Sequence, residues 1–404
     1  MRRINPTAFR IARRGTSREI NRTIALNLIR AKQPISRAEL ARLMGLRRGA
    51  VSRLVDELLE ARRVFEGVKG ESKRGRRPTY LHLETRQRCV LAVDISATRS
   101  SIMVTDPIGQ PLLEVVEFPT KRQPKAHLEE LVKRITAVLV AHPEVGECVG
   151  LGVVVSGLVD MGGGRLRYSP TLGWRDFDLT APLQEATNLP VVVENSCKAC
   201  VLAQVWAVRG DAPLDGPVAF VNVSDGVGVG IAVDGKLLRG ANNIAGEFGH
   251  VPLDIHGPLC SCGQRGCWEA YCSKRSMIAR YLGEDPSWPE SALLNGVSVA
   301  DIIERARAHD PKALEVLLET GQSLGRGFAT IVKTIDPRRI YVGGEITAAW
   351  DLIEGTVHAA MREGRLMRDV ALTEILTVGL GEHPRLRGAA ALVNAPAFAA
   401  PVMA

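Results

Sequence analysis

The sequence lacks the segments by which proteins enter or cross membranes. No apolar run among its 404 residues is long enough to span a bilayer. The basic stretch at residues 1–14 is not followed by the apolar core of a secretory signal peptide. We therefore expect a cytoplasmic protein that does not associate with membranes.

The chain also lacks a disulfide framework. Four of its eight cysteines are scattered, and the others do not form the regular spacing of a small secreted scaffold. Without an export signal, a reducing compartment and metal-bound thiolates are the better interpretation. The content of 46% hydrophobic and 24% charged residues is that of a globular protein, and the length corresponds to about two to four domains.

Positive charge is concentrated at one end of the chain. Residues 1–88 contain 23 basic and 8 acidic residues, a net charge of +15, whereas the remainder contains 29 and 36, a net charge of −7. A basic head on an acidic body indicates that only the head meets a polyanion. A solvated basic tail is the alternative, but it would not need the helical pattern found there.

The head carries three helical patterns. Apolar residues recur at helical spacing from about Ser17 to Lys32. Ser36 begins a second helix, with Glu39 three residues later as in a capping box. Gly45 makes a short turn into a third helix over residues 46–64, whose first turn is basic. This order is typical of a helix-turn-helix, although any helical hairpin shares it.

A β-wing is expected after these helices. Residues 64–83 alternate loosely around a tip rich in Gly, Lys and Arg. That run can lie along phosphates or in a minor groove, or it can be a solvated linker. We interpret residues 1–85 as a winged helix-turn-helix that binds double-stranded operator DNA. The expected contacts are Arg47, Arg48, Ser52 and Arg53 on the third helix and Arg74, Arg76 and Arg77 on the wing.

A dense group of thiols stands in the stretch from Gly246 to Glu269. Cys260, Cys262 and Cys267 form a C-x-C-x4-C cluster, and His250 can supply a fourth ligand. Three Cys and one His are a common closed set for tetrahedral structural zinc. Three unrelated buried thiols are the alternative. The stretch also carries carboxylates that a metal does not need, so we expect a zinc-folded loop that presents them to a polyhydroxylated ligand.

From Cys89 onward the sequence pattern is typical of an α/β protein. Buried strands recur between helical segments, which indicates two related lobes. We expect a first lobe over residues 86–195, completed by a C-terminal helix at 385–404. The second lobe, which contains the zinc loop, is expected over residues 196–384.

The segments GEFGH and CSCGQRGCWEA make the body resemble the ROK family. The resemblance covers roughly residues 17–395. Members of that family are sugar kinases and sugar-responsive transcription regulators on a two-lobed, actin-like ATPase (ribonuclease-H-like) fold. With a winged helix-turn-helix in front, the chain is similar to the regulator branch, which includes the xylose and N-acetylglucosamine operon repressors.

The resemblance implies roles for particular residues. Those matching the family's sugar contacts are Asn195, Glu247, His250 and Glu269, and Thr171 lies in a segment similar to the one that closes over the sugar. Carboxylates and amides suit this role because paired hydroxyls need fixed acceptors and donors. The residues matching the family's zinc ligands are His250, Cys260, Cys262 and Cys267.

Three departures from the family pattern argue against kinase activity. The phosphate motif D-x-G-G-T is replaced over residues 94–98 by a sequence without glycine. Ser196 stands where the family's catalytic Asp follows Glu-Asn, and a hydroxyl is a poor base near neutral pH. Asp225 occupies the second phosphate loop, where a carboxylate repels a polyphosphate. We expect a sugar sensor that is not an enzyme.

Three functions remain open at this point. The first, which we favour, is a sugar-responsive repressor of carbohydrate genes that forms a dimer or larger homo-oligomer and whose effector is a monosaccharide or a derivative. The second is an active sugar kinase with an appended DNA-binding head. The third is a regulator controlled by a protein partner or by phosphate esters.

Overall fold

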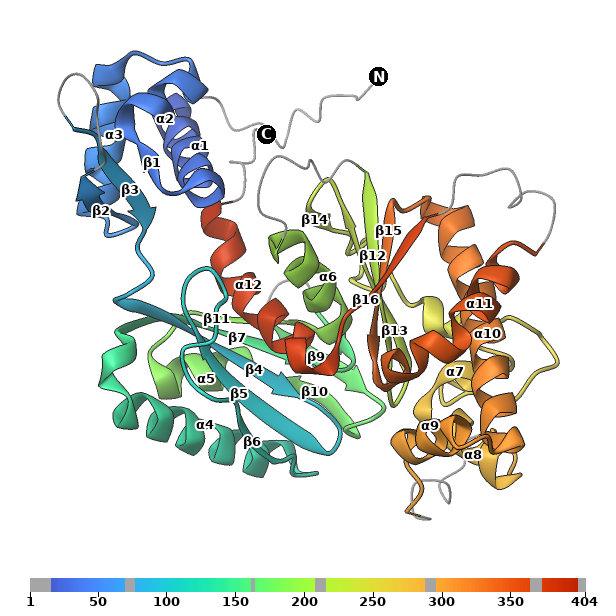
Figure 1. The fold of residues 1–404 in the computed structure, drawn as a ribbon. Helices are drawn as coiled ribbons and strands as arrows, with labels where there is room; N and C mark the ends of the chain where they lie inside the picture. Colours follow the sequence, from blue (N-terminus) through green and yellow to red (C-terminus); the bar gives the residue numbers. More distant parts are fainter. Residues whose placement is uncertain are drawn as a thin grey trace.

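The computed structural model describes residues 16–69, 77–160, 164–207, 216–287, 296–363 and 373–398. A small N-terminal head and two larger lobes follow one another along the chain, and each lobe is built on its own five-stranded sheet (Figure 1). In these residues, no helix is both long and apolar enough to cross a membrane.

The head consists of three helices and a small antiparallel sheet. Ser36 caps α2, since its Oγ accepts a hydrogen bond from the backbone N–H of Glu39 at 3.2 Å. Gly45 ends α2 in the left-handed conformation, with φ of 63°, which a glycine adopts without strain. The elements are α1 (Thr16–Lys32), β1 (Ile35–Ser36), α2 (Arg37–Met44), α3 (Arg48–Glu60), β2 (Val64–Lys69) and β3 (Thr79–Leu83).

The third helix is shorter than predicted at both ends. Arg47 precedes it in an extended conformation, so the helix begins at Arg48. Arg62 has a positive φ of 50° and turns the chain into β2. The hairpin of β2 and β3 then packs beside the helices, with β3 between β1 and β2, in the arrangement of a winged helix-turn-helix.

The first lobe is a mixed sheet covered on both faces. Its strand order is β11-β7-β4-β5-β6. Alternate residues of β4 pack against α4 and α5 on one face, and the intervening residues pack against α6 and α12 on the other. The elements are β4 (Arg88–Ile95), β5 (Arg99–Thr105), β6 (Val116–Pro119), α4 (Pro124–Ala141), β7 (Glu147–Val155), α5 (Thr180–Thr187), β11 (Val191–Asn195) and α12 (Pro384–Phe398). A small sheet of β8 (Leu158–Val159), β9 (Arg165–Ser169) and β10 (Trp174–Asp178) lies after β7.

The second lobe repeats this plan with the order β14-β13-β12-β15-β16. Its largest apolar core lies between the sheet and the helices of the 269–361 segment. The elements are β12 (Pro217–Val223), β13 (Val227–Val233), β14 (Lys236–Leu237), α7 (Glu269–Cys272), α8 (Lys274–Leu282), α9 (Val299–Arg307), α10 (Pro311–Ile335), β15 (Arg339–Gly344), α11 (Trp350–Met361) and β16 (Glu374–Thr377).

Helix α6 (Ser196–Ala207) lies between the two sheets. Its buried residues Cys200 and Val201 pack on the second sheet, whereas Ala199 and Leu202 share a core with α12. The approach of α6 to α12 is close, because a Cβ atom at Gly388 would collide with the backbone of Ala199. The helix therefore has one face on each lobe.

Candidate ligand-binding cleft and metal cluster

A cleft of about 390 Å³ opens between the two lobes. Residues such as Ser156 come from the first lobe and residues such as Arg275 from the second, while Arg385 reaches in from α12. The volume lies in the usual range for small-molecule sites. All five residues predicted to contact a sugar line this cleft: Thr171, Asn195, Glu247, His250 and Glu269.

Asn195 is held at the junction of β11 and α6. Its side-chain oxygen accepts hydrogen bonds from the backbone N–H groups of Cys197 at 2.9 Å and Lys198 at 3.2 Å. Its amide donates to the carbonyl of Gly157 at 2.9 Å. The side chain thus orders the first turn of α6. One of its two amide N–H groups binds Gly157, and the other is available to a ligand.

Glu269 is fixed against the turn that contains Asp225. Its Oε2 atom accepts a hydrogen bond from the backbone N–H of Val227 at 3.0 Å, and its Oε1 atom accepts one from Ser261 Oγ at 3.2 Å. Each carboxylate oxygen has lone pairs beyond these bonds. Glu247 faces the same cleft. Although part of its surface still meets the open space of the cleft, burial raises the pKa of this carboxyl, and the nearby His250 and Lys198 oppose that rise.

The four predicted metal ligands form one cluster. The candidate ligand atoms of His250, Cys260, Cys262 and Cys267 all lie within 4.8 Å of one another. The Nδ1 atom of His250 is 3.6 Å from Cys260 Sγ, and the Sγ atoms of Cys262 and Cys267 are also 3.6 Å apart. Three soft thiols and one imidazole match the donor set that holds a tetrahedral metal, so the cluster fits one.

The cluster and the cleft share His250. Because its Nδ1 atom faces the thiol of Cys260, the Nε2 edge remains for a ligand in the cleft. Ser261 and Cys262 line the cleft as well, so the metal loop forms part of the cleft wall. A metal at this cluster would therefore fix the loop that carries one side of the ligand site.

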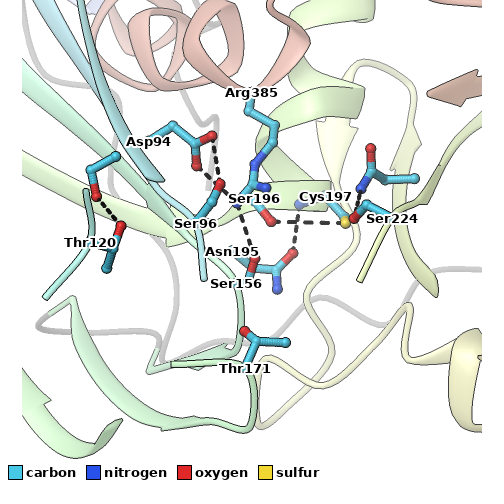
Figure 2. A network of polar contacts seen from close by, with 12 residues as sticks. Asp94, Ser96, Thr120, Ser156, Thr171, Asn195, Ser196, Cys197, Ser224 and Arg385 are labelled. Atoms are coloured by element: carbon cyan, nitrogen blue, oxygen red, sulfur yellow. Dashed lines mark hydrogen bonds and ion pairs between the residues drawn. The ribbon is translucent and has the colours of Figure 1, made fainter. Parts of the chain in front are cut away.

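Arg385 is a cleft residue that was not found from the sequence. Its guanidinium lies 2.8 Å from Asp94 Oδ1 and donates a hydrogen bond to Ser156 Oγ at 3.0 Å (Figure 2). Burial raises the pKa of the Asp94 carboxyl, and the charge of Arg385 and a hydrogen bond from Ser96 oppose that rise. An arginine at the start of a small-residue helix offered no distinguishing pattern, since its partners Asp94 and Ser156 stand 291 and 229 positions earlier in the chain.

All three departures from the kinase pattern have residues that line the cleft: Ser96 and Ala97 of the first, Ser196, and Asp225. Ser196 is buried, and its Oγ lies 4.0 Å from Cys197 Sγ. Asp225 stands in a tight turn in which the N–H of Ser224 donates to the carbonyl of Gly226 at 2.9 Å. A Cβ atom at Gly226 would collide with the carboxylate of Glu269, so this turn lies directly against a predicted sugar contact.

A buried polar network behind the cleft also escaped sequence analysis. The side chain of Lys198 is 2% exposed and donates to the backbone oxygen and to Oδ1 of Asn243, the latter at 2.8 Å. Asn243 in turn donates to the carbonyl of Val159 at 2.7 Å. Glu194 forms an ion pair with Arg239 at 2.9 Å. These bonds tie the segment before Glu247 to the first lobe, and burial lowers the pKa of Lys198.

The residues predicted to contact DNA stand on the surface of the head. Arg47, Arg48 and Arg53 are exposed at the start of α3, and Ser52 is partly exposed. Arg77 is exposed just before β3. Arg74 and Arg76, the other two predicted contacts, lie outside the described residues.

An arginine clasp fixes α3 relative to the rest of the head. Arg37 on α2 forms ion pairs with Asp56 of α3 at 2.7 Å and with Glu66 of β2 at 2.9 Å. Its guanidinium also donates to the backbone carbonyl of Ser52 at 3.3 Å. The clasp therefore orients the exposed face of α3 against both α2 and the wing.

Known proteins resemble this chain in sequence and in structure. The model of the ROK family matches residues 90–395. The xylose repressor of Bacillus spizizenii is 28% identical over 377 residues, which cover 93% of this chain and 95% of the relative. The crystal structure of a ROK family transcriptional regulator, a homologue of the E. coli MLC protein, matches 95% of this chain and 97% of its own with a TM-score of 0.77 at 23% identity.

A kinase structure matches a smaller share of the chain. The ROK family glucokinase of Streptomyces griseus, in complex with glucose and AMPPNP, covers 75% of this chain and 98% of its own, with a TM-score of 0.64 and 28% identity. The predicted fold class is thereby confirmed: a winged helix-turn-helix precedes a two-lobed, actin-like sugar-kinase fold. Since the family model matches most of the chain, this protein belongs to the ROK family.

Proposed function

We propose that this protein is a sugar-responsive transcription repressor of carbohydrate genes. The head binds operator DNA, and the cleft between the lobes binds a monosaccharide or a derivative that changes the affinity for DNA. The observation that carries the proposal is the presence, in one chain, of a winged helix-turn-helix and a cleft lined by all five predicted sugar contacts. A xylose repressor that aligns over 93% of this chain, head included, supports it.

The polar groups of the cleft suit a polyhydroxylated ligand. The carboxylates of Glu247 and Glu269 accept hydrogen bonds from hydroxyl groups, while Asn195 and the Nε2 edge of His250 supply an amide and an imidazole. Apolar side chains such as Ile244 and Leu158 line the same cleft and can contact the C–H face of a sugar ring. Together these groups can fix the positions of several hydroxyls at once.

Structural zinc is the metal we propose for the Cys3His cluster. His250, Cys260, Cys262 and Cys267 would hold it as four protein ligands, which leaves no open position for chemistry. Its contribution is to fold the loop that places His250 and Glu269 at the cleft.

Phosphoryl transfer is absent in this proposal. Ser196 cannot act as the carboxylate base that activates a sugar hydroxyl, and the loss of a general base alone typically costs about 10²–10⁴ in rate. Asp94 is engaged by Arg385, and Asp225 places a negative charge in the cleft. We propose that the cleft therefore senses a sugar without modifying it.

The head presents the chemistry of a major-groove reader. Arg47 and Arg48 stand exposed at the N-terminal end of α3, where a recognition helix meets base edges. An arginine there can form two hydrogen bonds with guanine. We propose that the protein binds a palindromic operator as a homodimer or larger assembly, because a single helix-turn-helix reads only half a site.

Two experiments on the full-length protein test this function. Selection from a pool of random DNA duplexes should enrich a palindromic sequence. Thermal unfolding should then be measured with D-xylose, D-glucose, N-acetylglucosamine, their phosphates and ATP. A sugar at about 100 times its dissociation constant adds roughly 2.7 kcal/mol to the free energy of unfolding. Enrichment of no sequence, together with no shift by any sugar, would contradict the proposal.

An active sugar kinase with a DNA-binding head is the second candidate. The match to a glucokinase in complex with glucose and AMPPNP favours it. The decisive assay measures ADP release in the presence of D-glucose or D-xylose. Turnover that depends on the sugar would establish kinase activity and contradict the proposed loss of phosphoryl transfer.

A further inference from the structure

Helix α6 connects the ligand cleft to the region below the head. Its first turn is ordered by Asn195, which lines the cleft and accepts hydrogen bonds from two backbone N–H groups of the helix. Its last turn carries Trp206, which lies 11 positions further along the chain. The helix is thus a single rigid element with one end at the predicted sugar site and the other near α1 (Figure 1).

Arg30 of the head is stacked on Trp206. The guanidinium carbon lies 3.5 Å from the centre of the indole ring, and the Nη2 atom donates a hydrogen bond to the backbone oxygen of Trp206. A cation over a tryptophan face is an attractive contact, and here it is joined by a charge-assisted hydrogen bond. One side chain at the C-terminal end of α1 therefore holds both the ring and the backbone of the last turn of α6.

The helices around the contact of Arg30 with Trp206 connect it to both the recognition helix and the body. Helix α1 also packs against α12, and α12 lies close against α6 where Gly388 meets Ala199. At the other end of α1, Arg18 forms an ion pair with Glu57 of α3, the recognition helix of the proposed function. A movement of the last turn of α6 would thus reach α3 through a helix that contacts both.

We infer that Arg30 and Trp206 form the joint that couples the ligand cleft to the DNA-binding head, with α6 as the connecting element. This inference rests on the proposed function and names the route of its regulation. A ligand that engages Asn195 and both lobes changes the position of the first turn of α6. The last turn then shifts Trp206, and Arg30 carries the shift into α1. Arg30 and Trp206 are positioning residues, since neither lines the cleft.

The test is a measurement of thermodynamic coupling in the full-length protein. Affinity for the selected operator duplex is measured with and without saturating D-xylose or D-glucose, whichever raises the melting temperature, and affinity for that sugar is measured with and without DNA. The two ratios must agree in each variant, because linkage is reciprocal. The informative variants are Arg30→Gln and Trp206→Leu, with Arg30→Lys and Trp206→Phe as conservative replacements.

Arg134→Gln is a matched control. Arg134 also lies over an aromatic ring, that of Phe118 at 4.9 Å, and its ion pair is with Glu130 at 2.6 Å, so both partners are in the first lobe. The control removes an arginine–aromatic contact of the same kind without touching the contact between head and body. Its coupling ratio should equal that of the wild type.

We expect Arg30→Gln and Trp206→Leu to bind the sugar within about twofold of wild type while the coupling ratio falls toward 1. Arg30→Lys and Trp206→Phe should restore part of the ratio, which a merely structural role would not predict. A ratio within twofold of wild type in Arg30→Gln would overturn the inference, even if Trp206→Leu failed to fold. If the wild type itself bound neither operator nor sugar, the proposed function would be the part that failed.

Discussion

Arg385, which lines the cleft, lies 2.8 Å from Asp94, although the two residues stand at opposite ends of the body in the sequence. The pair joins the last helix to the first strand of the sheet, and Ser96 donates a further hydrogen bond to Asp94 at 3.1 Å. The carboxylate is thereby engaged by the protein's own cation. In this chain, the segment that corresponds to the family's D-x-G-G-T motif therefore forms a structural contact between α12 and β4.

The first prediction concerns this contact and Ser196. Ser196→Asp supplies the carboxylate that a sugar kinase needs, but we expect no phosphorylation, because Asp94 stays paired with Arg385 and Asp225 still repels a polyphosphate. The assay is ADP release with D-glucose and D-xylose, and the same variant should keep its sugar-dependent shift in melting temperature. Turnover above the wild-type background would show that a missing base was the only defect.

The second prediction concerns the metal cluster. Cys262→Ser should reduce bound zinc from about one ion per chain to almost none, lower the melting temperature and abolish the shift caused by the sugar. The cause is that the ligand loop forms part of the cleft wall. Metal content is measured by mass spectrometry of the purified protein. The control is Cys148→Ser, a half-buried thiol on β7 outside the cluster, and equal metal content in the two variants would contradict the assignment.

The third prediction concerns Glu269. Glu269→Gln should weaken sugar binding by about tenfold to 150-fold, because a hydrogen bond to a charged acceptor is worth about 1.5–3 kcal/mol. The amide oxygen can still accept from the N–H of Val227, so the loop should keep its fold. Calorimetric titration with the sugar measures the change. Glu345→Gln is the control, since Glu345 pairs with Lys274 outside the cleft, and a similar loss there would show that the effect is general.

The fourth prediction concerns His127, whose side chain is fully buried. Its Nδ1 atom accepts the N–H of Lys121 at 3.3 Å, so Nε2 carries the proton that it shares with Ser100 Oγ at 3.1 Å. Burial is the main reason that its pKa falls to about 4. Below about pH 6.5 the His127 side chain takes up a proton in the unfolded state but stays neutral in the folded state. The free energy of unfolding therefore decreases as the pH falls from about 6.5 toward 4.

The size of this effect follows from the linkage of protons to unfolding. Between pH 7 and pH 5, His127 should contribute a loss of about 2 kcal/mol in the free energy of unfolding. His127→Asn should be less stable at pH 7 but should lose less between the two pH values. Urea denaturation at both values measures the difference. Equal losses in wild type and variant would contradict the lowered pKa.

The sequence was informative where function depends on residues close together in the chain. The thiols at 260–267 and the capped helix α2 could be found because a metal loop and a helix cap are local structures. Arg385 and Lys198 could not be found in this way. Each acquires its role from a partner on another element, Asp94 and Asn243, and only the packing of α12 and α6 brings these partners together.

The boundaries of the third helix show the same limit. The helix itself was predicted correctly, and its apolar residues Val51, Leu54, Val55 and Leu58 are buried. Its ends were placed wrongly because the helical spacing of apolar residues continues beyond the helix, as far as Val64, which is the first residue of β2 in the structure. The positive φ of Arg62 turns the chain after the helix, which allows β2 to pair with β3. The local pattern of apolar residues contains no sign of this pairing.

The last prediction concerns the exposed start of α3. Arg48→Ala should lower the affinity ratio between the selected operator and unrelated DNA by about 1–3 kcal/mol, or roughly fivefold to 150-fold, because one bidentate contact to a guanine carries that much discrimination. Arg47→Ala should act similarly, because Arg47 makes no side-chain cap for the helix and is free to face DNA. The measurement is a mobility-shift titration at fixed salt with both duplexes.

Arg42→Ala is the control for this loss of positive charge. Arg42 is exposed on α2 and pairs only loosely with Glu39, at 3.9 Å. If it meets only phosphates, it should weaken binding to both duplexes alike and leave their ratio unchanged. A ratio that falls equally in Arg42→Ala and Arg48→Ala would mean that the head reads DNA through charge alone. In that case α3 would not be the recognition helix, and the side chains that select the operator would have to lie elsewhere on the head.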